Sequence, residues 1–455
     1  MKLDIREMYM PGHFGNSYDV MGEFEMAEKL KESVYWGFNA YSDWFDSAGL
    51  TAPFNEAPHC SNSLIIWQRK KAFYRSAADS GLRIGLCVTP NHVFADQVTE
   101  KNKAKKGEKL FGQLVCPSTK SGENIILGNY EWFFKDLKKD GIELDFLTLG
   151  PYDYGGCACD KCAPWITTFA GLSVKIHKLA KKYHGKVMLD FVGWWWDPKE
   201  HELFKEWMEK KHPGLARGMS LHILYEKNEP INAVLPQGCG RRAFIHAGYP
   251  EKVKIEGIFD RYSMMGPVVA PKRIQNTIEG LVRSKSEGFM VYSEGMYEDA
   301  NHALIGALSS GKAVTSGEAL IEYAKRYYKV SGRDAKLWAD FLLCFGDWTD
   351  IDIEGAAKQY KYLSSVSEPG WRLEQWGEKI KLIRLNRRIS TMKGWGPVRL
   401  KLVDEWHKTL EDTRRGVYAL GVQRHIFVPQ FCGADWHKEW MALGKKSANR
   451  ISKEA

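Results

Sequence analysis

The chain has 455 residues, of which 44% are hydrophobic, and it carries a net charge of +9. That length and apolar content suit one large barrel or sandwich with a smaller domain. The basic residues are dispersed in short runs such as 101–109, which argues against a nucleic-acid groove and leaves a surface that would attract an anionic substrate.

Short apolar runs alternate with helical periodicity from residue 1 to about 312. The predicted strands lie at 2–10, 34–45, 82–90, 144–151, 186–194, 216–225, 241–248 and 288–295. Every strand except the sixth is followed by a predicted helix, at 22–33, 62–80, 123–139, 164–183, 199–211, 271–286 and 299–309. This alternation predicts an α/β fold, a (β/α)₈ TIM barrel over residues 1–312. An open doubly wound sheet is the second candidate, but no strand leads into a Gly-rich phosphate loop.

The pattern changes at about residue 316, where apolar residues begin to recur at three- and four-residue spacing. Segments such as EALIEYAKRYYK and EQWGEKIKLIRLNRRIS show this spacing over several turns. We therefore predict an α-helical C-terminal domain over residues 316–455.

The carboxyl ends of the strands form the active-site face of such a barrel. Asp153 follows the fourth predicted strand and Glu294 ends the eighth, so they should face each other across the mouth. Paired carboxylates of this kind cleave glycosidic bonds. We predict Asp153 as the general acid, and Glu294 as nucleophile or base, kept ionised by its polar neighbours. Asp260 is the reserve catalytic residue.

Aromatic side chains bind the apolar face of a sugar ring, and GWWWDP at 193–198 is a candidate platform. At least one of its tryptophans should lie in the core, because neighbours on a strand point to opposite faces. Asp46 and Asp197 have an alternative interpretation as helix N-caps. The predicted substrate-binding residues are His13, Asp46, Tyr152, Trp194, Trp196, Asp197, Glu226, His246, Arg261, Tyr262 and Tyr292.

Three of the nine cysteines, Cys157, Cys159 and Cys162, follow the fourth strand with C-x-C-x₂-C spacing. Cys116 lies in the connection before that strand, on the same barrel face. Together the four predict a structural zinc site that braces the Asp153 loop. Reduced thiols and a Cys159–Cys162 redox dithiol are the alternatives, and an iron–sulfur cluster is disfavoured by the spacing.

Three stretches resemble (β/α)₈ glycoside hydrolases of the α-glucuronidase and N-acetylhexosaminidase-like groups. They are LVCPSTKSGENIILGNYEWFFKDL, GPYDYGGCACDKC and ALIEYAKRYY. The resemblance implies a barrel, a helical C-terminal domain and glycosidase activity. Hexosaminidases that use the substrate's acetamido group usually carry two adjacent acids after the fourth strand, whereas this chain has Asp153-Tyr154. The resemblance therefore implies no particular sugar.

We expect a glycosidase that acts on an oligosaccharide or glycoside, with no organic cofactor. Two other functions compete: a metal-dependent hydrolase or isomerase built on His13, His92 and His246, and a non-catalytic carbohydrate-binding barrel. No apolar h-region and no membrane-spanning stretch occur in the sequence, so we expect a cytoplasmic protein without a membrane partner. A secreted protein whose leader has been removed would look the same.

Overall fold

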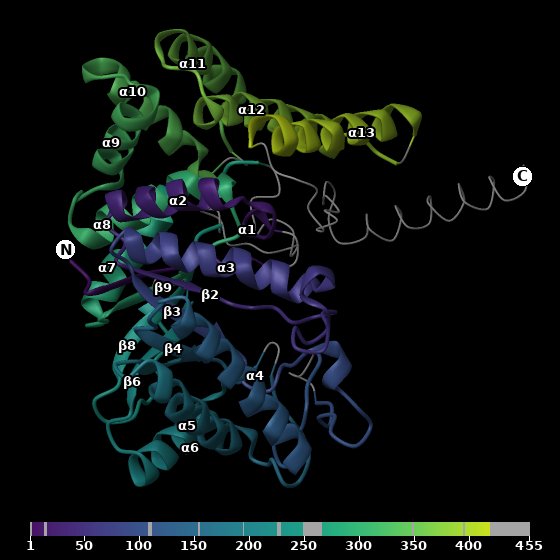
Figure 1. The fold of residues 1–455 in the computed structure, drawn as a ribbon. Helices are drawn as coiled ribbons and strands as arrows, with labels where there is room; N and C mark the ends of the chain where they lie inside the picture. The colour runs from purple at the N-terminus through teal and green to yellow at the C-terminus, as the bar shows by residue number, and fades with distance from the viewer. Residues whose placement is uncertain are drawn as a thin grey trace, which may run out of the picture.

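The computed structural model describes residues 2–12, 16–107, 112–152, 155–193, 195–224, 229–248, 266–347, 350–394 and 396–418 (Figure 1). Eight parallel strands close into a barrel, because β5 pairs with both β4 and β6. They are β1 (Ile5–Tyr9), β2 (Ala40–Asp43), β3 (Arg83–Val88), β4 (Phe146–Leu149), β5 (Met188–Val192), β6 (Ala216–Leu224), β8 (Gly240–His246) and β9 (Gly288–Tyr292). The predicted TIM barrel is therefore confirmed. A short strand, β7 (Glu229–Pro230), pairs antiparallel with β6.

Helices surround this barrel in the predicted order, and β6 is followed by β7 instead of a helix. They are α2 (Glu23–Trp36), α3 (Asn62–Asp79), α4 (Lys120–Lys139), α5 (Trp165–Tyr183), α6 (Pro198–Lys211), α7 (Pro271–Arg283) and α8 (Asp299–Ser310), with a short α1 (Ser17–Val20) before them. One predicted boundary is wrong: residues 34–36 belong to α2, not to the second strand. The helix ends at Gly37, whose φ of 109° suits a left-handed C-terminal cap.

The barrel interior has a charged layer below an aromatic one. Arg242 on β8 pairs with Asp190 on β5 at 2.6 Å, and Glu7 on β1 accepts a hydrogen bond from Ser42 on β2. Gly218 leaves room for the arginine, since a Cβ there would lie 2.3 Å from its Cζ. The layer nearer the strand ends contains Tyr9, Trp44, Cys87, Val192, Phe244 and Met290. Aromatic side chains thus form the floor of the mouth.

Up to residue 418, the end of the described chain, five further α-helices follow the barrel: α9 (Ser316–Tyr328), α10 (Gly332–Cys344), α11 (Ile353–Val366), α12 (Trp371–Ser390) and α13 (Pro397–Asp412). The first begins at residue 316, as the periodicity predicts, and packs against α8 (Figure 1). The division into domains at 312–316 stays a prediction, as does the helical character of residues 419–455, which lie outside the described residues. Within the described part of the chain, no helix combines the length and apolarity needed to cross a membrane.

A buried ionic cluster around Asp299 joins the barrel helices to the C-terminal helices. Its carboxylate accepts hydrogen bonds from Lys29 on α2 at 3.1 Å, from Tyr323 on α9 at 2.9 Å and from Arg372 on α12 at 2.6 Å. Although burial opposes the charge, Arg372 and Lys29 outweigh it and hold the pKa of Asp299 well below its usual value. The anion therefore compensates a buried cation, Lys29, and a partly buried one, Arg372, at once.

We expect Asp299→Asn to lower the free energy of unfolding by about 3–5 kcal/mol, because it leaves both cations without a counter-charge. Urea denaturation measures the change. Glu354→Gln is the control, since it breaks an exposed pair with Arg384 and should leave the unfolding curve where it is. Equal small effects for both variants would show that Asp299 does not join the two groups of helices.

Candidate active site

Side chains from several strands converge at the carboxyl end of the barrel. The rings of Tyr9 on β1 and Tyr292 on β9 lie 5.8 Å apart, and His246 at the end of β8 lies 5.3 Å from Tyr292. Trp44, directly after β2, lies 6.1 Å from His92 in the connection after β3. We call this group, together with Glu294, the mouth cluster. It includes three predicted site residues, His246, Tyr292 and Glu294.

Glu294 is the buried carboxyl of the mouth cluster, with 6% of its surface exposed. The Tyr292 hydroxyl donates a hydrogen bond to its Oε1 at 2.6 Å. Burial nevertheless outweighs this bond and raises the pKa of Glu294 to about 7. The expectation that polar neighbours keep this group ionised stays a prediction, and the raised pKa runs against it. A carboxyl that retains its proton near neutral pH suits a general acid better than a nucleophile.

A second carboxyl, that of Glu298, contacts the Glu294 backbone and was not among the predicted site residues. Its Oε2 accepts hydrogen bonds from the Glu294 backbone N–H at 3.0 Å and from the Ser293 hydroxyl at 2.6 Å. Tyr18 and Ser293 share a further hydroxyl contact of 2.5 Å. Burial is the main cause that raises the pKa of Glu298 to about 8. Glu298 thus fixes the backbone position of Glu294. It is also a second buried carboxyl whose pKa is raised.

The stability of the protein should depend on pH through Glu298. Its folded pKa of about 8 lies above the ordinary 4.5, so the folded chain keeps a proton that the unfolded chain releases. The stabilisation from this proton is complete below about pH 4.5 and is lost as pH rises through about 8. Urea unfolding should show the stability of Glu298→Gln increasing relative to wild type between pH 5 and 8. Parallel pH curves for the two proteins would refute this.

The loop after β4 is held rigidly on both sides of Asp153, which itself lies outside the described residues. Before it, the Pro151 carbonyl accepts a hydrogen bond from the Trp165 indole at 2.9 Å, and the Tyr152 hydroxyl donates to Glu200. After it, the Asn91 side chain bonds both the N–H and the carbonyl of Gly156, at 2.8 and 2.7 Å. Strands β4 and β9 stand opposite each other in the closed barrel, as predicted.

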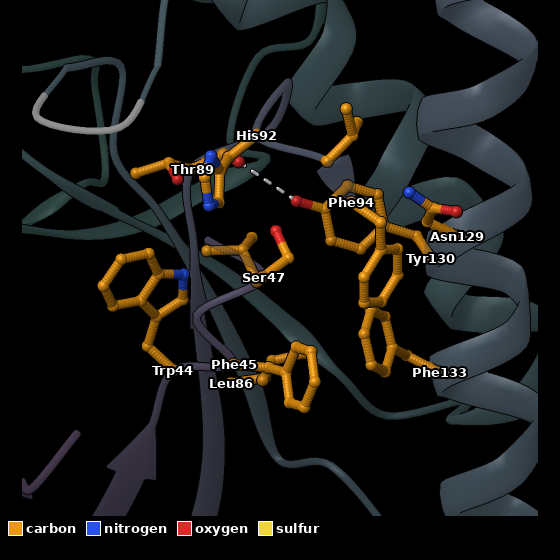
Figure 2. Close-up of a pocket in the computed structure, with 12 residues that line it drawn as sticks. Trp44, Phe45, Ser47, Leu86, Thr89, His92, Phe94, Asn129, Tyr130 and Phe133 are labelled. Atoms are coloured by element: carbon orange, nitrogen blue, oxygen red, sulfur yellow. Dashed lines mark hydrogen bonds between the residues drawn. The ribbon is translucent and has the colours of Figure 1, made fainter. Parts of the chain in front are cut away.

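Asp46 and His92 lie together beside the mouth, where the His92 Nε2 is 3.5 Å from the aspartate. Asp46 also accepts a hydrogen bond from the Ala48 N–H at 2.8 Å. Figure 2 shows a cavity next to them, lined by Trp44, Phe45 and aromatic residues of α4. Its volume of about 30 Å³ suits one water molecule and is too small for a sugar. This cavity is therefore not a carbohydrate-binding pocket.

Two residues of the GWWWDP segment that were predicted to bind substrate, Trp196 and Asp197, have structural roles instead. Trp196 is 8% exposed and packs against Phe169 and Phe204, so it belongs to the core and not to a sugar platform. Asp197 caps α6, because its carboxylate accepts the Glu200 N–H at 2.9 Å, which supports the helix-cap interpretation. Trp195, which was not predicted, is 59% exposed. The remaining predicted site residues lie outside the described residues: His13, Trp194, Glu226, Asp260, Arg261 and Tyr262.

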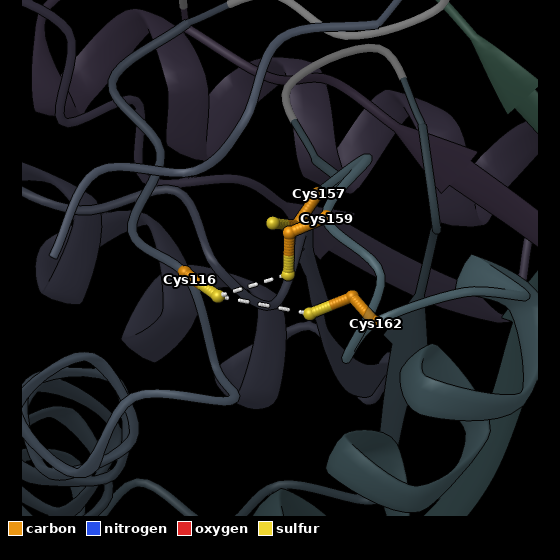
Figure 3. Close-up of side chains that lie close together, drawn as sticks. All are labelled: Cys116, Cys157, Cys159 and Cys162. Carbon is orange, nitrogen blue, oxygen red and sulfur yellow. Dashed lines mark hydrogen bonds between the residues drawn. The ribbon is translucent and has the colours of Figure 1, made fainter.

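The four predicted cysteines converge, with all four Sγ atoms within 4.8 Å of one another (Figure 3). Cys116 Sγ lies 3.7 Å from both Cys159 Sγ and Cys162 Sγ. A disulfide would need about 2.05 Å, whereas tetrahedral zinc with Zn–S bonds of about 2.3 Å places its sulfurs about 3.8 Å apart. The cluster could therefore hold a metal ion. Its geometry joins the connection after β3 to the loop after β4.

The two described histidines of the competing metal-hydrolase hypothesis, His92 and His246, belong to no comparable group. Among the residues that the structure describes, the four cysteines are the one set of three or more side chains arranged to bind a metal ion. His92 and His246 belong to no such set, and His13 lies outside the described residues. The described histidines therefore give this hypothesis no support.

No family model matches the chain, and no curated protein matches it. An alpha-amylase from Geobacillus thermoleovorans, solved with acarbose, is 11% identical and aligns over 68% of this chain and 80% of its own, with a TM-score of 0.43. The Thermobaculum terrenum O-GlcNAc hydrolase is 8% identical over 91% and 84%, with a TM-score of 0.45. A beta-N-acetylhexosaminidase is 11% identical over 72% and 78%, with a TM-score of 0.44. Each is a glycosidase by name, but likenesses of this size carry no inference about the activity of this chain.

Proposed function

We propose that this protein is a glycoside hydrolase whose catalytic carboxyls are Glu294 and Asp153. The observation that carries the proposal is the buried, hydrogen-bonded Glu294 carboxyl at the mouth of the barrel, with a pKa raised to about 7. Opposite it stands the loop of Asp153, anchored on both sides by Asn91 and Trp165. A sugar between the two would meet a proton donor and a carboxylate.

In this mechanism Glu294 donates its proton to the glycosidic oxygen as the bond to the leaving group breaks. As that bond breaks, Asp153 either attacks the anomeric carbon or deprotonates a water that attacks it, depending on the separation of the two carboxyls. In the first case the product is a glycosyl-enzyme, which water hydrolyses after Glu294, now ionised, takes a proton from it. About 5–5.5 Å gives retention and about 6.5–9.5 Å gives inversion. Glu298 holds the backbone of the acid in place, while Tyr292 orients its carboxyl.

The test is a panel of 4-nitrophenyl and 4-methylumbelliferyl glycosides that covers neutral, N-acetylated and uronic sugars. We expect turnover of at least one of them, with kcat/KM falling as pH rises through about 7, because the acid then loses its proton. Absence of turnover on the panel and on natural oligosaccharides would favour the non-catalytic carbohydrate-binding barrel.

We further propose that Cys116, Cys157, Cys159 and Cys162 bind one structural zinc ion. The support is a donor set of four thiols that lie within 4.8 Å of one another, with two Sγ–Sγ distances of 3.7 Å that suit tetrahedral coordination. Two backbone hydrogen bonds also hold the cysteine segments in place. The Cys116 N–H donates to the Asn102 carbonyl at 2.7 Å, and the Ala158 N–H donates to the Lys105 carbonyl at 3.0 Å. Zinc here would brace the Asp153 loop and take no part in bond cleavage.

A further inference from the structure

The short helix α1 lies against the turn that follows β9 and carries Glu294. The Ser17 N–H donates to the Glu294 carbonyl at 3.0 Å, and the Ser17 hydroxyl accepts from the Met296 N–H at 3.3 Å. Strands β1 and β9 are neighbours in the barrel, which brings these two connections together although they are far apart in the sequence. One serine therefore binds the backbone on both sides of Gly295.

The contact with Ser17 requires a glycine at position 295. A Cβ at Gly295 would lie 2.0 Å from the Ser17 Oγ and 2.7 Å from the Ser17 Cβ. The φ of Gly295 is 165°, which is extended backbone that any residue adopts, so its conformation does not explain a glycine. The close approach of Ser17 therefore accounts for the glycine that follows Glu294 in the chain.

Tyr18, the next residue of α1, binds the same turn through Ser293. The two hydroxyl oxygens lie 2.5 Å apart. Because Ser293 donates its hydrogen to Glu298 at 2.6 Å, Tyr18 is the donor to Ser293. The helix thus supports both the backbone of Glu294 and the carboxyl of Glu298, which itself accepts the Glu294 N–H.

α1 is well anchored although it has only four residues. The Asn16 side chain caps it by accepting the Asp19 N–H at 3.1 Å, and the Asn16 amide donates to the Pro11 carbonyl at 2.7 Å. At the other end, the Met21 N–H donates to the Ser17 carbonyl at 2.9 Å. Tyr18 is fully buried in the main hydrophobic core. The support beneath the Glu294 turn is therefore held by contacts of its own.

We propose that Ser17 is a positioning residue for Glu294, and that it holds the turn around Gly295 so that the Glu294 carboxyl stays buried at the mouth of the barrel. Its two bonds are to backbone atoms, so it acts through the turn and not on the carboxyl itself. A general acid must lie within hydrogen-bond reach of the oxygen that it protonates, and a displacement of about 1 Å can cost about 10²-fold in rate. The role in catalysis rests on the proposed function, whereas the packing of Ser17 on Gly295 does not.

The kinetic test is a double-mutant cycle on a glycoside that the wild type hydrolyses. Gly295→Ala forces the turn away from Ser17, and we expect it to lower kcat by about 10²-fold while KM changes much less. Adding Ser17→Gly should restore most of this loss, because it removes the two atoms nearest to the new methyl group. Gly128→Ala on α4 is the matched control: a Cβ there meets nothing within 4 Å, so kcat should stay unchanged.

An NMR titration of the Glu294 carboxyl, in protein with labelled glutamate, measures the same displacement without a substrate. Glu294→Gln identifies the signal, and the titratable groups that interact with it are Tyr18, Tyr292, Tyr297 and Glu298. Gly295→Ala should move the midpoint from about pH 7 toward the ordinary 4.5, because a displaced carboxyl is less buried. Adding Ser17→Gly should move it back. A merely structural role would lower Tm in Gly295→Ala and leave the midpoint where it is.

Ser17→Ala keeps the inference testable if Gly295→Ala does not fold, since it removes only the hydroxyl. We expect a smaller fall in kcat, about two- to tenfold, and a smaller movement of the Glu294 midpoint in the same direction. Wild-type kcat and midpoint in Ser17→Ala, or an effect of Gly295→Ala that Ser17→Gly does not reduce, would overturn the inference. Absence of turnover by the wild type would refute the glycosidase proposal alone, and the titration then still tests whether Ser17 positions Glu294.

Discussion

Replacing Glu294 by glutamine is expected to lower kcat/KM on a glycoside substrate by about 10²–10⁴-fold. The amide has the shape of the protonated acid but cannot transfer a proton. Because the wild-type carboxyl is buried and its pKa is raised to about 7, the neutral amide should not destabilise the fold. We expect a Tm at or above that of wild type at pH 8, measured by differential scanning calorimetry.

The leaving group shows whether Glu294 is the acid. A 2,4-dinitrophenyl glycoside needs little protonation as its bond breaks, whereas a methylumbelliferyl glycoside needs more. Glu294→Gln should therefore lose much less activity on the first than on the second. An equal loss on both substrates would contradict the acid role and return Glu294 to the nucleophile or base role that its sequence context indicated.

Removing one cysteine of the Cys116, Cys157, Cys159 and Cys162 cluster should have the largest effect on stability. Structural zinc contributes about 10–16 kcal/mol of binding free energy in zinc-finger peptides, so the loss of one ligand can cost several kcal/mol. Cys116→Ser is the most informative variant, since Cys116 alone comes from the connection after β3. We expect it to lose bound zinc and to show a markedly lower Tm.

Elemental analysis and calorimetry measure these effects without any substrate. Cys344→Ser is the matched control, because Cys344 is an exposed free thiol on α10 and should leave both zinc content and Tm unchanged. Wild-type protein that contains no zinc, and whose Tm does not respond to added zinc, would contradict the metal proposal.

The sequence predicted the barrel well because strand and helix periodicities alternate along residues 1–312, with the sixth strand as the exception. The boundary at 34–36 was missed because the apolar run VYW suits either a strand or the buried end of a helix. The cysteine cluster was predictable because spacing and barrel topology together place four thiols on one face. The barrel and the cysteine cluster were therefore predictable because both depend on local sequence pattern and on the order of the elements along the chain.

The site was harder to predict because its chemistry depends on burial. Tyr292 and Ser293 suggest a polar setting for Glu294, but the folded chain buries the carboxyl. In the GWWWDP segment, which follows the end of β5, the sequence predicts that at least one tryptophan is in the core but not which one, and the fold buries Trp196 and exposes Trp195. Glu298 was missed because Glu294 precedes the short 3₁₀ turn Met296–Glu298, so no helical spacing relates the two residues, and it is the turn that brings the Glu298 carboxyl to the Glu294 backbone.

Side-by-side turnover of wild type, Asp153→Asn, Glu294→Gln and Asp197→Asn on one glycoside tests the central claim most directly. The first two variants remove the proposed catalytic carboxyls, whereas Asp197→Asn changes a carboxylate that the structure uses as a helix cap, where asparagine serves equally well. We predict losses of about 10²–10⁴-fold for Asp153→Asn and Glu294→Gln, and near wild-type turnover for Asp197→Asn. Near-full turnover by folded Asp153→Asn and Glu294→Gln would contradict the assignment.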